Sequence, residues 1–257
     1  MSTSPAWAPP LLAVQFLTRL PVPWLDRLSA EAARDGLRRS VIWFPLVGTM
    51  VGGITALLIL AGAKLWPLWL AILVALAIEA RLTGAFHEDA VADFCDALGG
   101  GHDAESTLRI LKDSRIGSFG AVGLLLALAL RAGATTALPP PLLAAGVVAA
   151  ATFARLMIVA AMVAIPPPPG AAGLARDVAG TIRPIMLPPA LLLALPGLAA
   201  VGALAPFRLA LALGLALLFL WWLQRLLLRR IGGATGDCLG FAAYAAQILL
   251  LLVLAAR

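Results

Sequence analysis

The chain has 257 residues, of which 62% are hydrophobic and 12% charged, and its formal net charge is +6 at pH 7. This composition lies outside the range of soluble globular domains and is typical of a protein that crosses a membrane several times. We expect one all-α domain over residues 1–257, a polytopic integral membrane helix bundle that contacts the lipid bilayer and no nucleic acid. Its two cysteines, Cys95 and Cys238, form no disulfide framework or CxxC metal pattern.

The apolar runs predict the membrane topology. Residues 11–25 are too short to span, and prolines 21 and 23 would break a helix, so this segment is expected at the membrane surface. Residues 26–40 are expected to form an exposed charged helix or loop. Apolar runs of about 20 residues can cross the bilayer, and about seven are predicted. They are residues 41–62, 65–81, 118–138, 142–165, 185–203, 207–228 and 239–256.

The charges predict the orientation of these spans. Arg38 and Arg39 stand directly before the first span and mark a cytoplasmic edge. With the N-terminus inside, the segments 82–117, 166–184 and 229–238 share the cytoplasmic side. Most of the nineteen Lys and Arg residues and all thirteen carboxylates then lie on that side. We therefore expect the polar chemistry at the cytoplasmic face.

Residues 83–101 carry the most informative pattern. Asp89, Asp93 and Asp96 are spaced by four and three residues, which places all three carboxylates on one face of a helix. Neighbouring anions repel one another, and a hard cation such as Mg²⁺ would remove the repulsion. The stretch therefore predicts a cytoplasmic acidic helix that binds Mg²⁺. The alternative is a solvated acidic face without a ligand.

A basic segment follows at residues 108–120. Its Arg and Lys side chains suit phosphate oxygens, and a helix beginning near Ser118 could add backbone amides. A contact with lipid headgroups is the alternative, but carboxylates for a metal and cations for phosphate together indicate phosphoryl transfer. The residues considered for substrate binding are Arg109, Lys112, Asp113, Ser114 and Arg115.

Polar residues elsewhere have two interpretations each. Asp237 in the glycine-rich segment 232–240 is either a metal ligand or the N-cap of the last helix. His87 is expected either to act on the substrate, by orienting it or as a base, or only to pack at a helix start. Arg155 lies within a span, where a charge usually faces the bundle interior, and Glu79 is its simplest partner.

Between the fourth and fifth predicted spans, a tetraproline at 166–169 predicts a stiff polyproline connector. Arg176, Asp177 and Arg183 follow it. The two arginines could reach a second phosphate or anchor the loop at the membrane. Gly48, Gly52 and Gly53 in the first span are expected to permit close helix packing.

These motifs resemble a known family. TGAFHEDAVADFCDALGG looks like the acidic signature of the cobalamin synthase family, also called adenosylcobinamide-GDP ribazoletransferase. LKDSRIGSFG, FLTRLPVP, WFPLVG and GGATGD are similar to further landmarks of that family, so the resemblance covers most of the chain. Ala90 and Ala97 stand where the family usually has glycine, a difference that could tilt the acidic helix.

The resemblance implies a Mg²⁺-dependent enzyme of the bacterial cytoplasmic (inner) membrane with its active site toward the cytoplasm. Its substrates would be adenosylcobinamide-GDP and α-ribazole or α-ribazole 5′-phosphate, with release of GMP. Catalytic roles are expected for Asp89, Asp93, Asp96, His87 and Lys112, and metal ligation for the three aspartates with Asp237 and, less directly, Glu88. A homo-oligomer or a complex with other B12 assembly enzymes is an open alternative to a monomer.

Two other functions combine membrane helices with charged residues. A CDP-alcohol phosphotransferase also combines Mg²⁺, membrane helices and an aspartate-rich helix, but its Asp-Gly-x-x-Ala-Arg pattern is absent, since Phe94 follows Asp93 and Ala90 follows Asp89. A membrane transporter would place ionisable residues at mid-membrane in several spans, and Arg155 is the clear case here.

Overall fold

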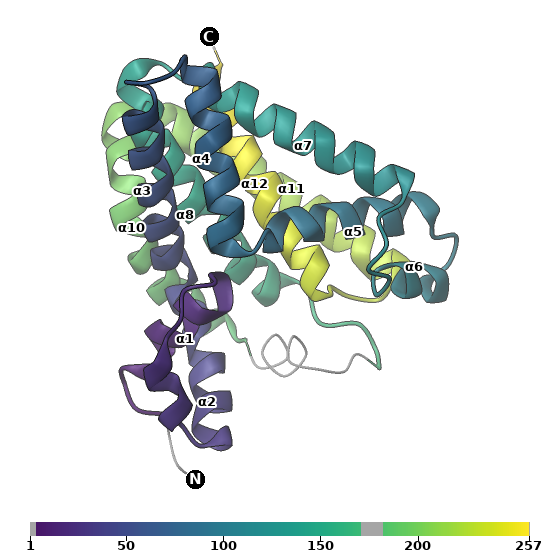
Figure 1. Cartoon of the computed structure of the whole chain (residues 1–257). Helices are drawn as coiled ribbons and strands as arrows, with labels where there is room; N and C mark the ends of the chain where they lie inside the picture. The colour runs from purple at the N-terminus through teal and green to yellow at the C-terminus, as the bar shows by residue number, and fades with distance from the viewer. Residues whose placement is uncertain (1–3, 171–181, 257) are drawn as a thin grey trace.

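The computed structural model describes residues 4–170 and 182–256, and these residues are helical, with no strand among them. Figure 1 shows the N- and C-termini at opposite ends of the molecule. The α-helices are α1 (Ala8–Leu17), α2 (Ala30–Ser40), α3 (Phe44–Gly62), α4 (Leu68–Thr83), α5 (Phe86–Gly100), α6 (Ala104–Ile110), α7 (Ser118–Thr136), α8 (Pro140–Ala164), α10 (Leu187–Leu204), α11 (Pro206–Arg230) and α12 (Gly236–Ala255). Three 3₁₀ turns are η1 (Pro23–Arg27), η2 (Val41–Trp43) and η3 (Pro184–Met186).

The expected polytopic helix bundle is confirmed. Six helical stretches in the described residues are long and apolar enough to cross a membrane, or seven if the bent pair α4 and α5 is one span. The predicted second span is α4, which has 16 residues and is short for a crossing. The helix that carries the first span begins before the predicted span, because the charged α2 continues through η2 into α3 and gives a continuous stretch of 33 residues, Ala30–Gly62.

Helix α8 forms the centre of the bundle and packs against α3, α10 and α12 (Figure 1). Of the apolar 18-residue stretch of α8, 78% is buried inside the bundle, compared with 22% of the corresponding stretch in α7 and in α11. Two glycines of α3 allow the close approach: a Cβ atom on Gly48 would lie 2.5 Å from the Ala151 carbonyl oxygen, and one on Gly52 would lie 2.8 Å from Val148 Cα. Gly53 was also expected to permit close helix packing. This is wrong, because a Cβ atom on Gly53 would meet no atom within 4 Å.

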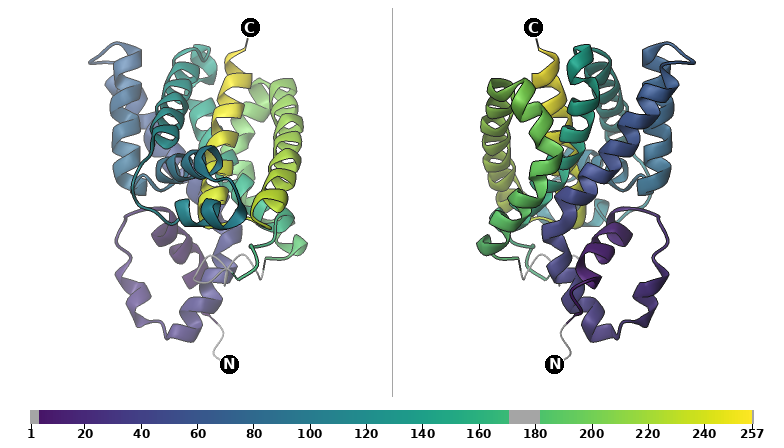
Figure 2. Two further views of the ribbon diagram at one scale, coloured as in Figure 1. Left: turned by 90° about the vertical axis from the view of Figure 1, so that its right-hand side faces the viewer. Right: turned by 90° about the vertical axis from the view of Figure 1, so that its left-hand side faces the viewer.

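The outer helices leave large apolar side chains uncovered. Leu125 on α7 and Leu217 on α11 are exposed, as a lipid-facing surface requires. Helices α1 and α2 stand apart from the upright helices at the N-terminal end, as the two views of Figure 2 also show. Ala8, Leu12, Val22 and Leu25 form a small core of their own there. As predicted from the prolines, α1 stops at ten residues.

Helix α5 crosses the bundle instead of continuing α4. The two axes differ by 89°, and α5 contacts α7 and α12 (Figure 1). The turn uses a left-handed conformation at two successive residues, Gly84 with φ +73° and Ala85 with φ +55°. Glycine adopts this conformation freely, but alanine pays a steric cost. The bend therefore takes the acidic helix out of the direction of the spans.

Candidate active site

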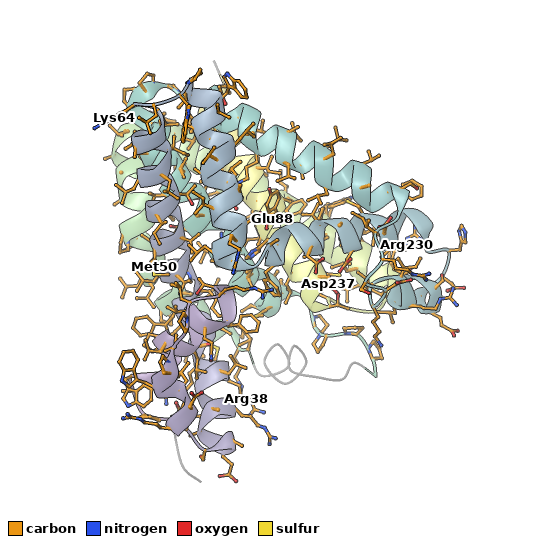
Figure 3. The ribbon with its side chains drawn as sticks, viewed as in Figure 1. Arg38, Met50, Lys64, Glu88, Arg230 and Asp237 are labelled. Carbon is orange, nitrogen blue, oxygen red and sulfur yellow. The ribbon has the colours of Figure 1, made fainter. Side chains whose placement is uncertain are left out.

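The acidic helix predicted at residues 83–101 is α5, and its carboxylates meet one from α12. Close packing brings the two helices together: the Phe94 and Phe241 rings stack with centroids 3.8 Å apart, and a Cβ atom on Gly240 would lie 2.5 Å from the methyl carbon of Ala90. Figure 3 shows Asp237 on α12 just below α5. The first turn of α12 thus lies against the acidic helix.

The electrostatics of Asp93 show which carboxylates are neighbours. Partial burial raises the pKa of Asp93 to about 6, and the negative charges of Asp89, Asp237 and Asp96 add to the shift, in that order. In the part of the chain that the structure describes, none of these four carboxylates forms a salt bridge. Among the described residues, the site is therefore a cluster of anions that form no ion pair with a protein cation.

Asp237 does not cap the last helix. The N-cap of α12 is Thr235, whose hydroxyl accepts a hydrogen bond from the amide of Cys238 at 3.4 Å. Asp237 lies two residues further on, in the first turn, where a negative charge is favoured by the helix dipole. Of the two interpretations of Asp237, the N-cap is wrong.

Asp96 has a different local role from Asp89 and Asp93. Its two carboxylate oxygens accept hydrogen bonds from the backbone amides of Gly117 at 2.6 Å and Gly120 at 2.7 Å, at the start of α7. The amides at this helix start were expected to be available for phosphate, and these two are instead used by Asp96. The contact ties the acidic helix to the end of the basic segment.

A bound Mg²⁺ fits the donor chemistry of this cluster. Among the described residues, no group of three His, Cys, Asp or Glu side chains is already close enough together to hold a metal ion. Mg²⁺ commonly uses only one or two carboxylates and completes its octahedron with water and substrate phosphates. Asp89, Asp93 and Asp237 offer such oxygens and form no salt bridge with the residues that the structure describes, so a partly hydrated ion is compatible with them.

The basic segment lies on the surface beside this cluster. Arg109 is exposed on α6, and Lys112 and Ser114 are exposed in the turn that leads to α7. Asp113 pairs with Arg115 through contacts of 2.7 to 3.2 Å, and these hydrogen bonds lower the pKa of Asp113 to about 2. Arg115 remains 87% exposed and precedes by two residues the glycine that is bound to Asp96.

His87 does not share the face of the acidic stripe. It is only 3% exposed, and burial, with the nearby charges of Arg155 and Arg131, holds its pKa well below the usual value. Its Nε2 atom has no hydrogen-bond partner. A buried, neutral imidazole next to arginines fits the packing alternative better than a role as an exposed base.

A buried ionic network lies behind the acidic helix. Arg131 of α7 donates from Nη2 to both carboxylate oxygens of Glu79 at 2.7 Å, and its Nη1 is 3.4 Å from Oε1 of Glu88. Thr55 donates to Glu79 at 2.7 Å, also from the interior. Glu88 therefore faces the network rather than the carboxylate cluster, which weakens its assignment as a metal ligand.

Sequence reasoning named the wrong partner for Glu79. Arg155 is 2% exposed and has no salt bridge among the described residues. Its Nε has no hydrogen-bond partner, and its Nη1 lies 3.5 Å from the Ala151 carbonyl oxygen. A second buried arginine, Arg131, was visible in the sequence as a charge within a span, but the sequence does not specify which arginine meets Glu79.

Arg230 is a further residue near the site that the sequence did not single out. It ends α11, and its guanidinium lies 3.5 Å from the carbonyl oxygen of Gly101, at the end of the acidic helix (Figure 3). The sequence marks Arg230 only as an arginine in the last turn of a helix, where basic residues are common. Arg176 and Asp177 lie outside the described residues.

The polyproline segment positions the loop that carries Asp237. The amide of Ala234 donates to the Pro166 carbonyl oxygen at 2.9 Å. A Cβ atom on Gly233 would lie 2.6 Å from the carbonyl carbon of Pro167, and Gly232 has φ +77°. Both glycines are thus required, one by the close approach of two backbones and the other by its left-handed conformation.

Comparison with known proteins relates this arrangement to one family. Residues 9–255 match the family CobS, cobalamin-5-phosphate synthase. Similar curated proteins are named adenosylcobinamide-GDP ribazoletransferase. Those of Ralstonia nicotianae and Ralstonia pickettii are 37% and 36% identical, over 95% of this chain and 93% and 94% of theirs. That of Brevibacillus brevis is 31% identical over 95% of this chain and 96% of its own. No solved structure matches.

Proposed function

Because the chain belongs to the cobalamin-5-phosphate synthase family and is an adenosylcobinamide-GDP ribazoletransferase of late coenzyme B12 assembly, we propose that the carboxylate cluster and the basic segment form its phosphoryl-transfer site. Adenosylcobinamide-GDP and α-ribazole, or α-ribazole 5′-phosphate, would be joined there with release of GMP. The observation that carries this proposal is the cluster of Asp89, Asp93 and Asp237, together with the hydrogen bonds of Asp96 that tie α5 to the end of the basic segment.

The proposed reaction exchanges one bond at phosphorus. A hydroxyl of the ribazole attacks the phosphorus that is linked to cobinamide, a new oxygen–phosphorus bond forms, and the bond to the GMP oxygen breaks. The hydroxyl proton passes to solvent, and GMP leaves with the electron pair. Bound Mg²⁺ would supply charge neutralisation at the pyrophosphate oxygens.

The residues of the chain have separate tasks in this scheme. Asp89, Asp93 and Asp237 would hold the ion, and Asp96 would fix α5 against the start of α7 through its two amide contacts. Lys112 and Arg115 would bind phosphate oxygens, Arg115 as a planar fork and Lys112 as a point charge. Asp113 would orient Arg115 by accepting hydrogen bonds from its guanidinium.

The membrane location follows in part from the helices, and the rest is proposed. The chain is a multi-pass membrane protein. We place it in the bacterial inner membrane with the site toward the cytoplasm, because Arg38 and Arg39 precede the first span and the segments at 82–117 and 229–238 carry the site together. Family membership decides against both a CDP-alcohol phosphotransferase and a transporter.

The test is turnover by protein purified in detergent. Adenosylcobinamide-GDP and α-ribazole should give GMP and joined product in equal amounts, EDTA should stop the reaction, and added Mg²⁺ should restore it. GMP release that continues without α-ribazole would instead indicate a pyrophosphate hydrolase. Turnover that EDTA leaves unchanged would remove the metal from the proposal.

A further inference from the structure

An apolar cavity of about 250 Å³ lies directly beside Asp237. Its walls come from the N-terminal helices α1 and α2, from α3 and α5, and from α8 and α12. Among the side chains that line it are Phe16, Phe44, Phe86, Leu37 and Met162, and Gly236 and Asp237 complete the wall toward the carboxylate cluster. The cavity is thus contiguous with the proposed reaction centre.

The aromatic side chains of the cavity are arranged as a set. Phe16 and Phe44 stack with centroids 5.6 Å apart and planes within 9°, while Phe86 meets Phe16 edge-on at 5.8 Å. Phe16 and Phe86 keep 37% and 39% of their surface exposed, although each lies in a cluster of aromatic rings. Flat apolar surface of this kind favours a planar aromatic ligand.

Resting on the proposed function, we propose that this cavity binds the aromatic base of α-ribazole. Ribazole is a riboside of a methyl-substituted benzimidazole, so its base is planar and presents little hydrogen-bonding capacity. With the base packed against the cluster of phenylalanines, the ribose projects past Gly236 and Asp237 toward the carboxylate cluster. Its hydroxyl then reaches the phosphorus that the basic segment and the ion hold.

The chemistry of the other substrate parts disfavours them as occupants. The guanine base of the second substrate carries several donors and acceptors on its edge, and burial without partners would be costly. The side chain with polar atoms in this wall is Asp237, which the proposal assigns to the ion. The corrin ring system exceeds a cavity of about 250 Å³, which is at the small end for a ligand site.

The test separates the two substrates kinetically. Phe16→Ala removes one aromatic wall at a half-exposed position, and Leu37→Trp fills the cavity from α2. Each variant should raise KM for α-ribazole roughly tenfold, and leave KM for adenosylcobinamide-GDP within about twofold. Phe207→Ala is the matched control, because Phe207 is 89% exposed at the start of α11 and far from the cavity lining.

Binding of α-ribazole alone, measured by calorimetry on the detergent-solubilised full chain, gives a second readout. Weakened binding by both variants and not by the control supports the assignment. Unchanged α-ribazole binding, or a rise in KM for adenosylcobinamide-GDP instead, overturns it. Wild-type turnover in the same assay keeps the two proposals distinguishable, since an active wild type with unaffected variants refutes the cavity assignment alone.

Discussion

Replacing Glu79 by glutamine should destabilise the protein strongly, because it removes the main counter-charge of a buried arginine. The side chains of Glu79 and Arg131 are each only 4% exposed and are joined by two hydrogen bonds of 2.7 Å. In Glu79→Gln, the carboxylate that Arg131 would still contact among the described residues is that of Glu88, at 3.4 Å. The charge of Arg155 nearby would lose the same compensation.

The expected loss in the free energy of unfolding is that of removing one partner of a buried ion pair. Removal of one partner costs about 3–5 kcal/mol when the other charge stays buried. Glutamine retains an amide that can accept one hydrogen bond, so the lower end, about 3 kcal/mol, is expected. For a chain of this length such a loss corresponds to a drop of roughly 6–12 °C in the melting temperature.

Thermal unfolding in detergent, followed by circular dichroism, measures this effect. Glu105→Gln is the matched control, since Glu105 is exposed on α6, and its melting temperature should be unchanged. The double variant Glu79→Leu with Arg131→Leu should recover much of the loss caused by Glu79→Leu alone, because the buried charge of Arg131 is removed together with its main counter-charge. A melting temperature for Glu79→Gln equal to that of the control would refute the reasoning.

Three further outcomes are expected. Asp93→Asn should reduce turnover by on the order of 100-fold, and near-normal activity of this variant at low Mg²⁺ would contradict the metal assignment. Lys112→Ala should instead act mainly on KM for the nucleotide substrate. Asp237→Asn should raise the Mg²⁺ concentration for half-maximal rate roughly tenfold, and since Thr235 is the N-cap, an unshifted curve would leave no role for Asp237 in metal binding. Cysteines placed at His102 and Pro140 should label from opposite sides of the membrane, and labelling of both from one side would refute the proposed orientation.

The helices were predictable from sequence because long apolar runs leave few other structures in a bilayer. The acidic helix was predicted within a few residues of α5, as the spacing of Asp89, Asp93 and Asp96 requires. Its direction was not predictable, because the 89° bend depends on two left-handed residues, and Ala85 gives no sign of that conformation in its residue type.

The tertiary contacts within the candidate site were the harder part. The placement of the two loops on one face brought Asp237 toward the acidic helix in the prediction, and the structure has these carboxylates as neighbours. The contact of Asp96 with the start of α7 joins positions 21 and 24 residues apart. The pairing of Glu79 with Arg131 bridges 52 residues. Neither contact produces a periodic pattern in the sequence. Both arise from the tertiary packing of the helices and could not be predicted from residue spacing.

The contact between Ala90 and Gly240 couples the residues that the two positions can hold. The methyl group of Ala90 lies where a side chain at position 240 would have to go. The two positions share one small volume, so a methyl group on either side excludes one on the other. Alanine at position 240 should therefore be tolerated in this chain only when position 90 is changed to glycine at the same time.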